Sequence, residues 1–184
     1  MSIRVFRTSG ADAWLLLASR HLAYLYDEVG DRSRAEALHA ENLQRARATG
    51  NDRFAATSLS ALADLALADS RVGDALELLT ESLTLHRDLG DVLDTAVDLA
   101  LFTSALARAS DFEIATCLAA ALDAVGDEIG VRGNRVRART QQALAAAREH
   151  LEPAIYDEAW ERGQALTLRE AVAFALDAAA PHQR

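Results

Sequence analysis

Residues 59–83 read LSALADLALADSRVGDALELLTESL, and this stretch decides the fold. Alanine and leucine fill many of the positions on both sides of the polar pair Ser70-Arg71, and these two residue types are among the strongest helix formers. No run of β-branched residues alternates with polar ones, as it would in a half-buried strand. The stretch therefore predicts two helices joined by a short turn at Ser70-Arg71.

The same unit recurs along the chain when the sequence is shifted by 40 residues. The shift places residues of similar kind on each other: Trp14 on Phe54, Leu22 on Leu62, Ala23 on Ala63, Ala35 on Ala75 and Ala115, Leu38 on Leu78 and Leu118, and Gly50 on Gly90. A fixed period of this size is typical of stacked units that bury one another's apolar faces. We predict an all-α fold, a superhelix of antiparallel helical hairpins repeating about every 40 residues.

The expected helices cover residues 12–28, 33–48, 52–69, 73–89, 92–108, 111–125, 134–150, 154–162 and 168–179. Residues 1–11 are an N-terminal segment, residues 12–130 three hairpins, and residues 131–184 a fourth, degenerate hairpin with a capping helix. Three pairs have the spacing of an N-terminal capping box, in which two side chains satisfy free backbone amides. These pairs are Ser33 with Glu36, Ser110 with Glu113 and Thr167 with Glu170.

Composition narrows the classes of function. The chain of 184 residues has a formal net charge of −9, and all 19 basic residues are arginine. This balance argues against direct binding to nucleic acid, whose phosphates attract basic proteins. No stretch approaches the roughly 20 apolar residues that span a bilayer, and no export signal is expected. The single cysteine, Cys117, lies among small apolar residues and is expected to be a buried thiol. We expect a cytoplasmic protein.

The repeat resembles a known family over residues 12–126. The order Leu62-Ala63, Ala66, Ala75, Leu79 and Ser82 resembles the pattern of a tetratricopeptide repeat. The period exceeds the usual value of about 34 residues, and hairpins end in RARATG at residues 45–50 and HRDLGD at residues 86–91. These features are similar to the repeats of large bacterial signal-transduction ATPases, including MalT-like and AfsR-like regulators.

The C-terminal part is similar to the closing segment of actinobacterial ATP-binding LuxR-type regulators. The residues that carry this resemblance are Leu151, Tyr156, Ala159, Trp160, Gly163, Leu166, Thr167, Leu168, Glu170, Ala171, Val172, Ala175 and Leu176. The resemblance implies the sensor or scaffold part of a transcriptional regulator, without cofactor or metal. A phosphate-binding loop of the GxxxxGK[ST] type needs a lysine, which this chain lacks. The expected partner is a protein or peptide segment, such as an ATPase or DNA-binding regulator module.

In tetratricopeptide arrays the first helix of each hairpin lines a concave groove, which implies where a partner would bind. The resemblance places these residues on that inner face: Arg20, Tyr24, Asp27, Thr57, Ser60, Asp64, Val97, Ser104 and Arg108. Arg20 and Arg108 would pair with a carboxylate or a phosphate. Tyr24 offers a flat apolar face with a hydroxyl group, and Asp64 would accept hydrogen bonds from a cation or an amide. An ordinary solvated helix surface would have the same composition.

Two further functions remain open. The groove would enclose a metabolite held by Arg20, Tyr24 or Arg108, which would make the chain a small-molecule sensor. Alternatively, the unsealed end of a short array would expose an apolar face that a second copy covers, giving a homodimer. The N-terminal segment 1–11, which includes Phe6, would instead cover that end if it folded back over the first hairpin.

No set of residues predicts catalysis, and we do not expect an enzyme. The five histidines, His21, His39, His86, His150 and His182, lack the spacing of metal ligands. His39 aligns with Leu79 of the next unit and is expected to pack in a partly buried position. Asp94 and Asp98 lie one helical turn apart and would share a proton only in an apolar cleft.

Overall fold

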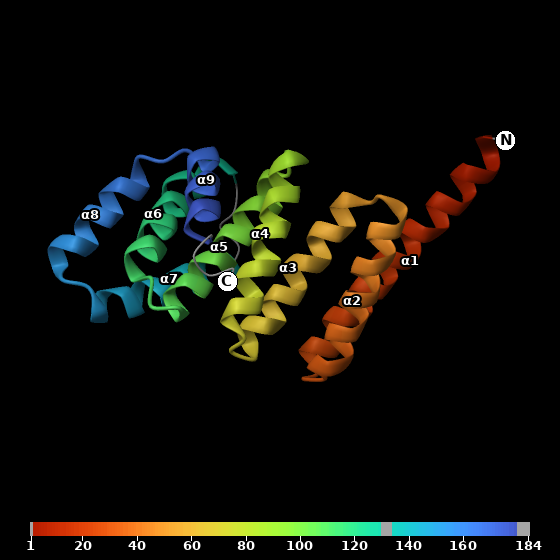
Figure 1. The fold of residues 1–184 in the computed structure, drawn as a ribbon, viewed down its shortest axis with the longest axis horizontal. Coiled ribbons are helices and arrows are strands. Elements are labelled where there is room, and N and C mark those ends of the chain that lie inside the picture. Colours follow the sequence, from red (N-terminus) through yellow and green to blue (C-terminus); the bar gives the residue numbers. More distant parts are fainter. Residues whose placement is uncertain (1, 130–133, 180–184) are drawn as a thin grey trace.

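The chain folds entirely into helices within the residues that the computed structural model describes, which are 2–129 and 134–179, with side chains described for 14–126 and 137–179. The helices are α1 (Ser2–Glu28), α2 (Arg32–Thr49), α3 (Asp52–Ala68), α4 (Val72–Asp88), α5 (Val92–Arg108), α6 (Phe112–Ile129), α7 (Asn134–His150), α8 (Pro153–Gln164) and α9 (Leu168–Ala179) (Figure 1). The predicted all-α class is confirmed.

Helix bounds agree within two residues with the sequence-based expectation except at the N-terminus and at the end of α6, which runs to Ile129 rather than to residue 125. The helices predicted for residues 92–108, 134–150 and 168–179 have these bounds in the structure. In contrast, α1 begins at Ser2 rather than at residue 12. Because no proline interrupts residues 2–11, the helix continues through them. The N-terminal segment therefore extends α1 and does not fold back over the first hairpin.

The turns between the first six helices share one geometry. A residue with positive φ occurs every 20 positions, at Gly30, Gly50, Ser70, Gly90 and Ser110, with φ between 61° and 83°. In each turn the next residue donates its N–H to the carbonyl five positions back, as Asn51 does to Ala46 at 2.9 Å. This pattern is the Schellman motif, which ends a helix with a left-handed residue. It allows the next helix to begin within two or three residues.

Only one of the three predicted capping boxes forms. Thr167 and Glu170 bind reciprocally, with Thr167 N–H donating to Glu170 Oε2 at 2.9 Å and Glu170 N–H to Thr167 Oγ1 at 3.3 Å. Ser33 lies inside α2, whose N-terminal cap is Asp31. Ser110 lies in the left-handed turn that ends α5. The predictions for Ser33 and Ser110 are wrong because the Schellman turns shift these serines away from the capping position.

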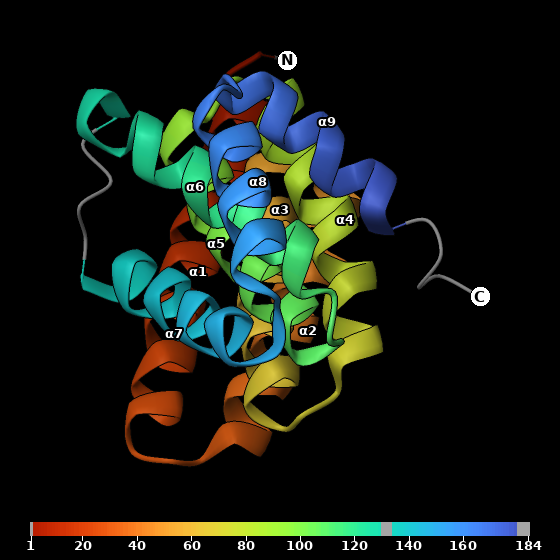
Figure 2. The same cartoon turned by 90° about the vertical axis from the view of Figure 1, so that its left-hand side faces the viewer.

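Successive helices from α1 to α7 contact each other in order, so each helix from α2 to α6 lies between its two neighbours in the sequence. In the region predicted as a fourth hairpin, α7 packs on α5 and α6, whereas α8 packs mainly on α6 and hardly on α7. Helix α9 crosses α4, α5 and α6. Viewed from this end of the molecule, α8 lies over α6 (Figure 2).

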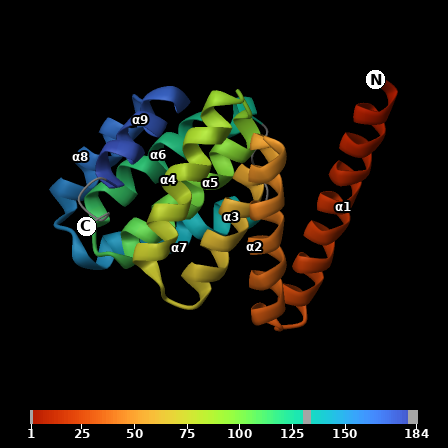
Figure 3. The ribbon, with the colours of Figure 1, turned by 45° about the vertical axis from the view of Figure 1, so that its right-hand side comes forward.

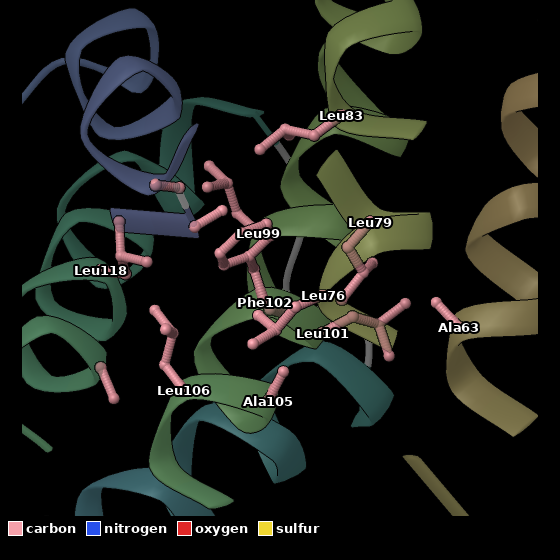
Figure 4. Packing of buried hydrophobic residues seen from close by; sticks show 14 of the residues in the cluster. Ala63, Leu76, Leu79, Leu83, Leu99, Leu101, Phe102, Ala105, Leu106 and Leu118 are labelled. Atoms are coloured by element: carbon pink, nitrogen blue, oxygen red, sulfur yellow. The ribbon is translucent and has the colours of Figure 1, made fainter. Parts of the chain in front are cut away.

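The main hydrophobic core surrounds α5. Phe102, Leu99 and Leu106 are fully buried there among residues of α3, α4, α6 and α9 (Figure 4). A second, smaller cluster joins α1, α2 and α3 and contains Leu16 and Leu43. The buried and free Cys117 lies in α6, as the sequence predicted.

Candidate functional site

The odd-numbered helices α1, α3, α5 and α7, with Arg32 at the start of α2, line two neighbouring cavities of about 400 and 410 Å³. The first is lined by Tyr24, Asp27, Glu28, Ser60, Ala61, Asp64, Val97, Leu101 and Arg139. The second is lined by Asp27, Arg32, Asp64, Leu65, Leu67, Ala68, Ser104, Arg108, Ala138, Arg139 and Gln142. Because both cavities share Asp27, Asp64 and Arg139, we treat them as one surface and call it the interhelix groove.

The structure brings most of the predicted site residues to this groove. Its first cavity is bordered by Tyr24, Asp27, Ser60, Asp64 and Val97, and its second by Asp27, Asp64, Ser104 and Arg108.

Arg20 and Thr57 are on the lining of neither cavity. The hydroxyl of Thr57 donates to the carbonyl of Arg53 in its own helix, at 2.9 Å. Arg20 is half-buried, and its Nε is buried without a hydrogen-bond partner. The predicted joint use of Arg20 and Arg108 for one anion therefore has no support in the geometry of the groove.

Ion pairs and main-chain contacts already engage several groove cations. Arg139 Nη2 lies 2.5 Å from Asp64 Oδ2 and joins α7 to α3. Arg32 bridges Asp27 at 3.9 Å and Asp69 at 3.5 Å. Arg108 donates to the carbonyl of Leu67 at the C-terminal end of α3. These guanidinium groups are held by the protein's own acceptors.

The first cavity is acidic and has an apolar side. Three carboxylates line it, those of Asp27, Glu28 and Asp64, against the single guanidinium of Arg139. The exposed Val97 and the buried Leu101 lie one turn apart on α5 and supply apolar surface. The arrangement suits a cationic group that is attached to an apolar side chain.

Sequence reasoning missed the contribution of α7. No residue of this helix was among the site residues predicted from the sequence, yet Arg139 lines both cavities. Arg132 and Arg135 lie outside the side chains that the structure describes. The signal in the sequence was the alternation of helices, in which the first helix of each hairpin lies on the inner face. Continued past residue 130, this alternation places α7 on the inner face.

A buried polar cluster lies away from the groove and joins α3, α4 and α5. Asp98 Oδ2 accepts from Ser82 Oγ at 2.7 Å and lies 2.8 Å from His86 Nδ1. Ser82 Oγ also lies 2.9 Å from the carbonyl oxygen of Ala56. Ser82, His86 and Asp98 are at most 1% exposed. In a hydrolase triad the serine contacts Nε2 of the histidine and the aspartate contacts Nδ1. Here Ser82 and His86 Nδ1 both contact Asp98, and all three side chains are buried.

His86 contacts both Asp94 and Asp98, which are one helical turn apart on α5. Its Nε2 is 3.8 Å from Asp94 Oδ2, while its Nδ1 faces Asp98. Burial opposes protonation of His86, but the hydrogen bond to Asp98 and the charges of Asp98, Asp94 and Asp91 outweigh it and raise the His86 pKa. Burial also raises the pKa of Asp94. The cluster therefore favours a protonated imidazole in the interior.

Comparisons with known proteins give no assignment. No protein-family model, curated protein or solved structure matches this chain. Within residues 2–129 and 134–179, no helix has the length and apolar character needed to cross a bilayer. Among the described side chains, no three His, Cys, Asp or Glu residues are grouped so that they could hold a metal ion.

Proposed function

We propose that this chain is a non-catalytic scaffold of the tetratricopeptide type whose interhelix groove binds a segment of another protein. The observation that supports it most is the pair of adjoining cavities across α1, α3, α5 and α7. Their lining alternates carboxylates with small and apolar side chains, which suits peptide recognition.

The charges of the groove favour a basic partner. Asp64 is paired with Arg139 and Asp27 with Arg32, but three carboxylates against one guanidinium still leave the lining of the first cavity net negative. This charge favours arginine or lysine side chains, and Val97 with Leu101 favours an adjacent apolar residue. The groove is less suited to binding an anionic metabolite, because Arg108 is bound to the Leu67 carbonyl and Arg139 to Asp64. We therefore place the protein-binding function ahead of the metabolite-sensing one.

The resemblance described above extends this proposal to a biological role. We propose a cytoplasmic relative, or a regulatory part, of a bacterial transcriptional regulator in which the helical array senses a partner. Binding would act by population shift, favouring the arrangement of the regulator that has the higher affinity for the partner.

The test is selection of random displayed peptides on the immobilised protein, followed by affinity measurements with a variant that fills the groove. Val97→Trp places a bulky ring in the first cavity. Leu93→Trp is its matched control, because Leu93 is also exposed, lies one turn earlier on α5 and is not on the lining of either cavity.

We expect selected peptides to combine basic and apolar residues, and V97W to weaken their binding by about tenfold, or roughly 1.4 kcal/mol, while L93W leaves it unchanged. Selection of acidic peptides, absence of any selected peptide, or equal weakening by both variants would contradict the proposal. Thermal unfolding of both variants checks that they are folded.

A further inference from the structure

The outer side of α1 carries a continuous row of exposed apolar side chains. We call it the α1 stripe, and it consists of Leu15, Ala18, Leu22, Leu25 and Val29, the last of which directly follows the helix. The large members are far from buried: Leu15 is 53% exposed, Leu22 44% and Leu25 57%. Their alternating spacing of three and four residues places them on one side of a helix, as in the seam of a coiled coil.

The same positions are buried in the next two hairpins. Forty residues after Leu15, Leu22 and Leu25 stand Ala55, Leu62 and Leu65, which are 3%, 8% and 5% exposed. Ala55 and Leu62 belong to the apolar cluster that includes Leu43 and Ala46 of α2, the second helix of the preceding hairpin.

A further 40 residues on, Phe102 and Ala105 on α5 are fully buried. The residues of α3 and α5 that are equivalent to Leu22 and Leu25 of the α1 stripe thus lie in the packed interior of the array. On α1, the first helix in the described structure, they have no neighbouring helix pair, and α1 lies at the edge of the molecule (Figure 3).

The opposite end of the array offers no matching surface among the side chains that the structure describes. Gly163 of α8 lies so close to α6 that a Cβ on it would be 2.1 Å from the carbonyl oxygen of Cys117. α9 packs on α4, α5 and α6 as well. In the described part of α6 to α9, Ile155 is the one large apolar side chain that is exposed. Among the described side chains of α6 to α9, head-to-tail stacking of copies therefore has no apolar acceptor.

We propose that the α1 stripe is a self-association surface, and that two copies of this chain form a closed dimer in which each α1 covers the stripe of the other. A two-fold interface uses the same patch on both subunits, so an uncovered apolar patch at one end and a sealed opposite end favour it over an open chain of copies. The spacing of the stripe matches the side-by-side packing of two helices.

The dimer leaves the interhelix groove accessible. At about 100° per residue, Leu22 and the groove residue Tyr24 point to directions about 160° apart around α1. Asp27, which also lines the groove, lies on the same broad side as Tyr24. Self-association is thus independent of the proposed peptide binding, and either can fail without the other.

The first test is the molar mass in solution, measured by size-exclusion chromatography with light scattering. The wild-type chain at about 100 µM is expected at twice its 19.8 kDa. The double variant Leu22→Glu with Leu25→Glu is expected to be a monomer, because it buries charges in the seam. Leu93→Glu, on an exposed apolar residue of α5 outside the stripe, is expected to remain a dimer.

Since the altered side chains are all exposed, circular dichroism should show an unchanged helix content. A monomeric wild-type chain, a dimer that survives the double substitution, or an open series of larger polymers would overturn the proposal.

The second test is a cross-link that does not depend on weakening the interface. Leu22 is at the middle of the stripe, so full overlap of two stripes brings Leu22 beside Leu22 of the second copy in either helix direction. Leu22→Cys is therefore expected to form an intermolecular disulfide on mild oxidation, since two such cysteines come within bonding distance.

The native Cys117 is buried and does not compete. Ile155→Cys, an exposed residue at the opposite end, is the control and is expected to remain uncross-linked. Equal cross-linking of both variants, or none of L22C, would show that the stripe is not the interface.

Discussion

At the scale of single residues, His39 of α2 is a buried group whose protonation the fold opposes. Its side chain is 2% exposed, its Nδ1 has no hydrogen-bond partner, and its ring meets Tyr24 edge-on at 5.4 Å. Burial lowers its pKa to about 4, with Asp27 opposing and Arg20 adding to the effect. An unfolded chain binds this proton near pH 6.5. Between pH 6.5 and 4 the unfolded state therefore binds more protons, and acidification destabilises the fold through His39.

The variant His39→Leu should remove this pH dependence. Leucine occupies the equivalent position 40 residues later, at Leu79, which is fully buried. Lowering the pH from 7 to 5 should cost the wild type about 2 kcal/mol more of unfolding free energy than the variant. Urea unfolding at both pH values measures the difference. His21→Gln is the control, because His21 is exposed and binds only the carbonyl of Leu17 in its own helix. An unchanged pH profile in H39L would contradict the assignment.

The two buried histidines differ in how far the sequence could reveal them. His39 was expected to be partly buried because it aligns with Leu79, and the structure confirms the burial. His86 could not be matched with Asp98 in the same way. The two residues are 12 positions apart on different helices, and only the packing of α4 on α5 brings them within 2.8 Å. Alignment of repeats predicts burial, whereas a specific polar partner depends on tertiary structure.

At the scale of elements, the contact between α8 and α6 depends on the absence of a side chain at Gly163. A Cβ there would lie 2.1 Å from the Cys117 carbonyl oxygen and 2.7 Å from Ala120 Cβ. Gly163→Ala should therefore push α8 away from α6 and lower the free energy of unfolding by about 3 kcal/mol. Equilibrium urea unfolding measures this loss.

Gly73→Ala is the matched control for this prediction. Gly73 lies in the first turn of α4 with nothing within 4 Å of a new Cβ. Alanine there should be neutral or stabilise the helix by up to about 1 kcal/mol, because glycine is the weaker helix former. A loss of similar size in G73A and G163A would mean that the close approach of α8 is not what the glycine provides.

The sequence predicted where helices occur better than it predicted which helices pair. Alanine- and leucine-rich segments separated by turns such as Gly50 and Gly90 set the helix bounds, because helix propensity and left-handed turns are local properties. The partner of α8 is a tertiary property. A hairpin of α7 with α8 was the expectation from sequence order, but Gly163 and Ala159 fit the surface of α6 more closely.

At the scale of the whole molecule, the groove was predicted in outline and not in detail. The expectation that first helices share an inner face grouped Tyr24, Ser60 and Val97, and these three residues line one cavity. It could not show that Arg108 and Arg139 are engaged by Leu67 and Asp64, because those contacts join helices far apart in the sequence. The repeat period of the sequence predicts which residues lie on the inner face. Which of their charged groups remain available to a ligand depends on the packing of the helices.

The packing of the array is uneven, which predicts an order of local unfolding. Helix α5 is buried along most of its length and lies in the main core, which joins α3, α4, α6 and α9. Helix α1 packs chiefly on α2, and the smaller cluster that holds it contains Leu16 from its own sequence. In repeat-like arrays each unit is stabilised mainly by its neighbours, so a unit with a neighbour on one side only opens first.

Hydrogen exchange followed by mass spectrometry tests this order in the monomeric variant L22E with L25E. Amides of residues 14–28 in α1 should exchange fastest among the helices α1 to α6, and those of residues 95–106 in α5 slowest. In the wild type at high concentration, α1 should gain protection while α5 does not change, because only α1 gains a neighbour from the second copy. Equal protection of α1 and α5 in the monomer would contradict the uneven distribution of stability. Equal protection of α1 in both proteins would contradict the dimer alone, so the exchange pattern separates the energetics of the array from its assembly.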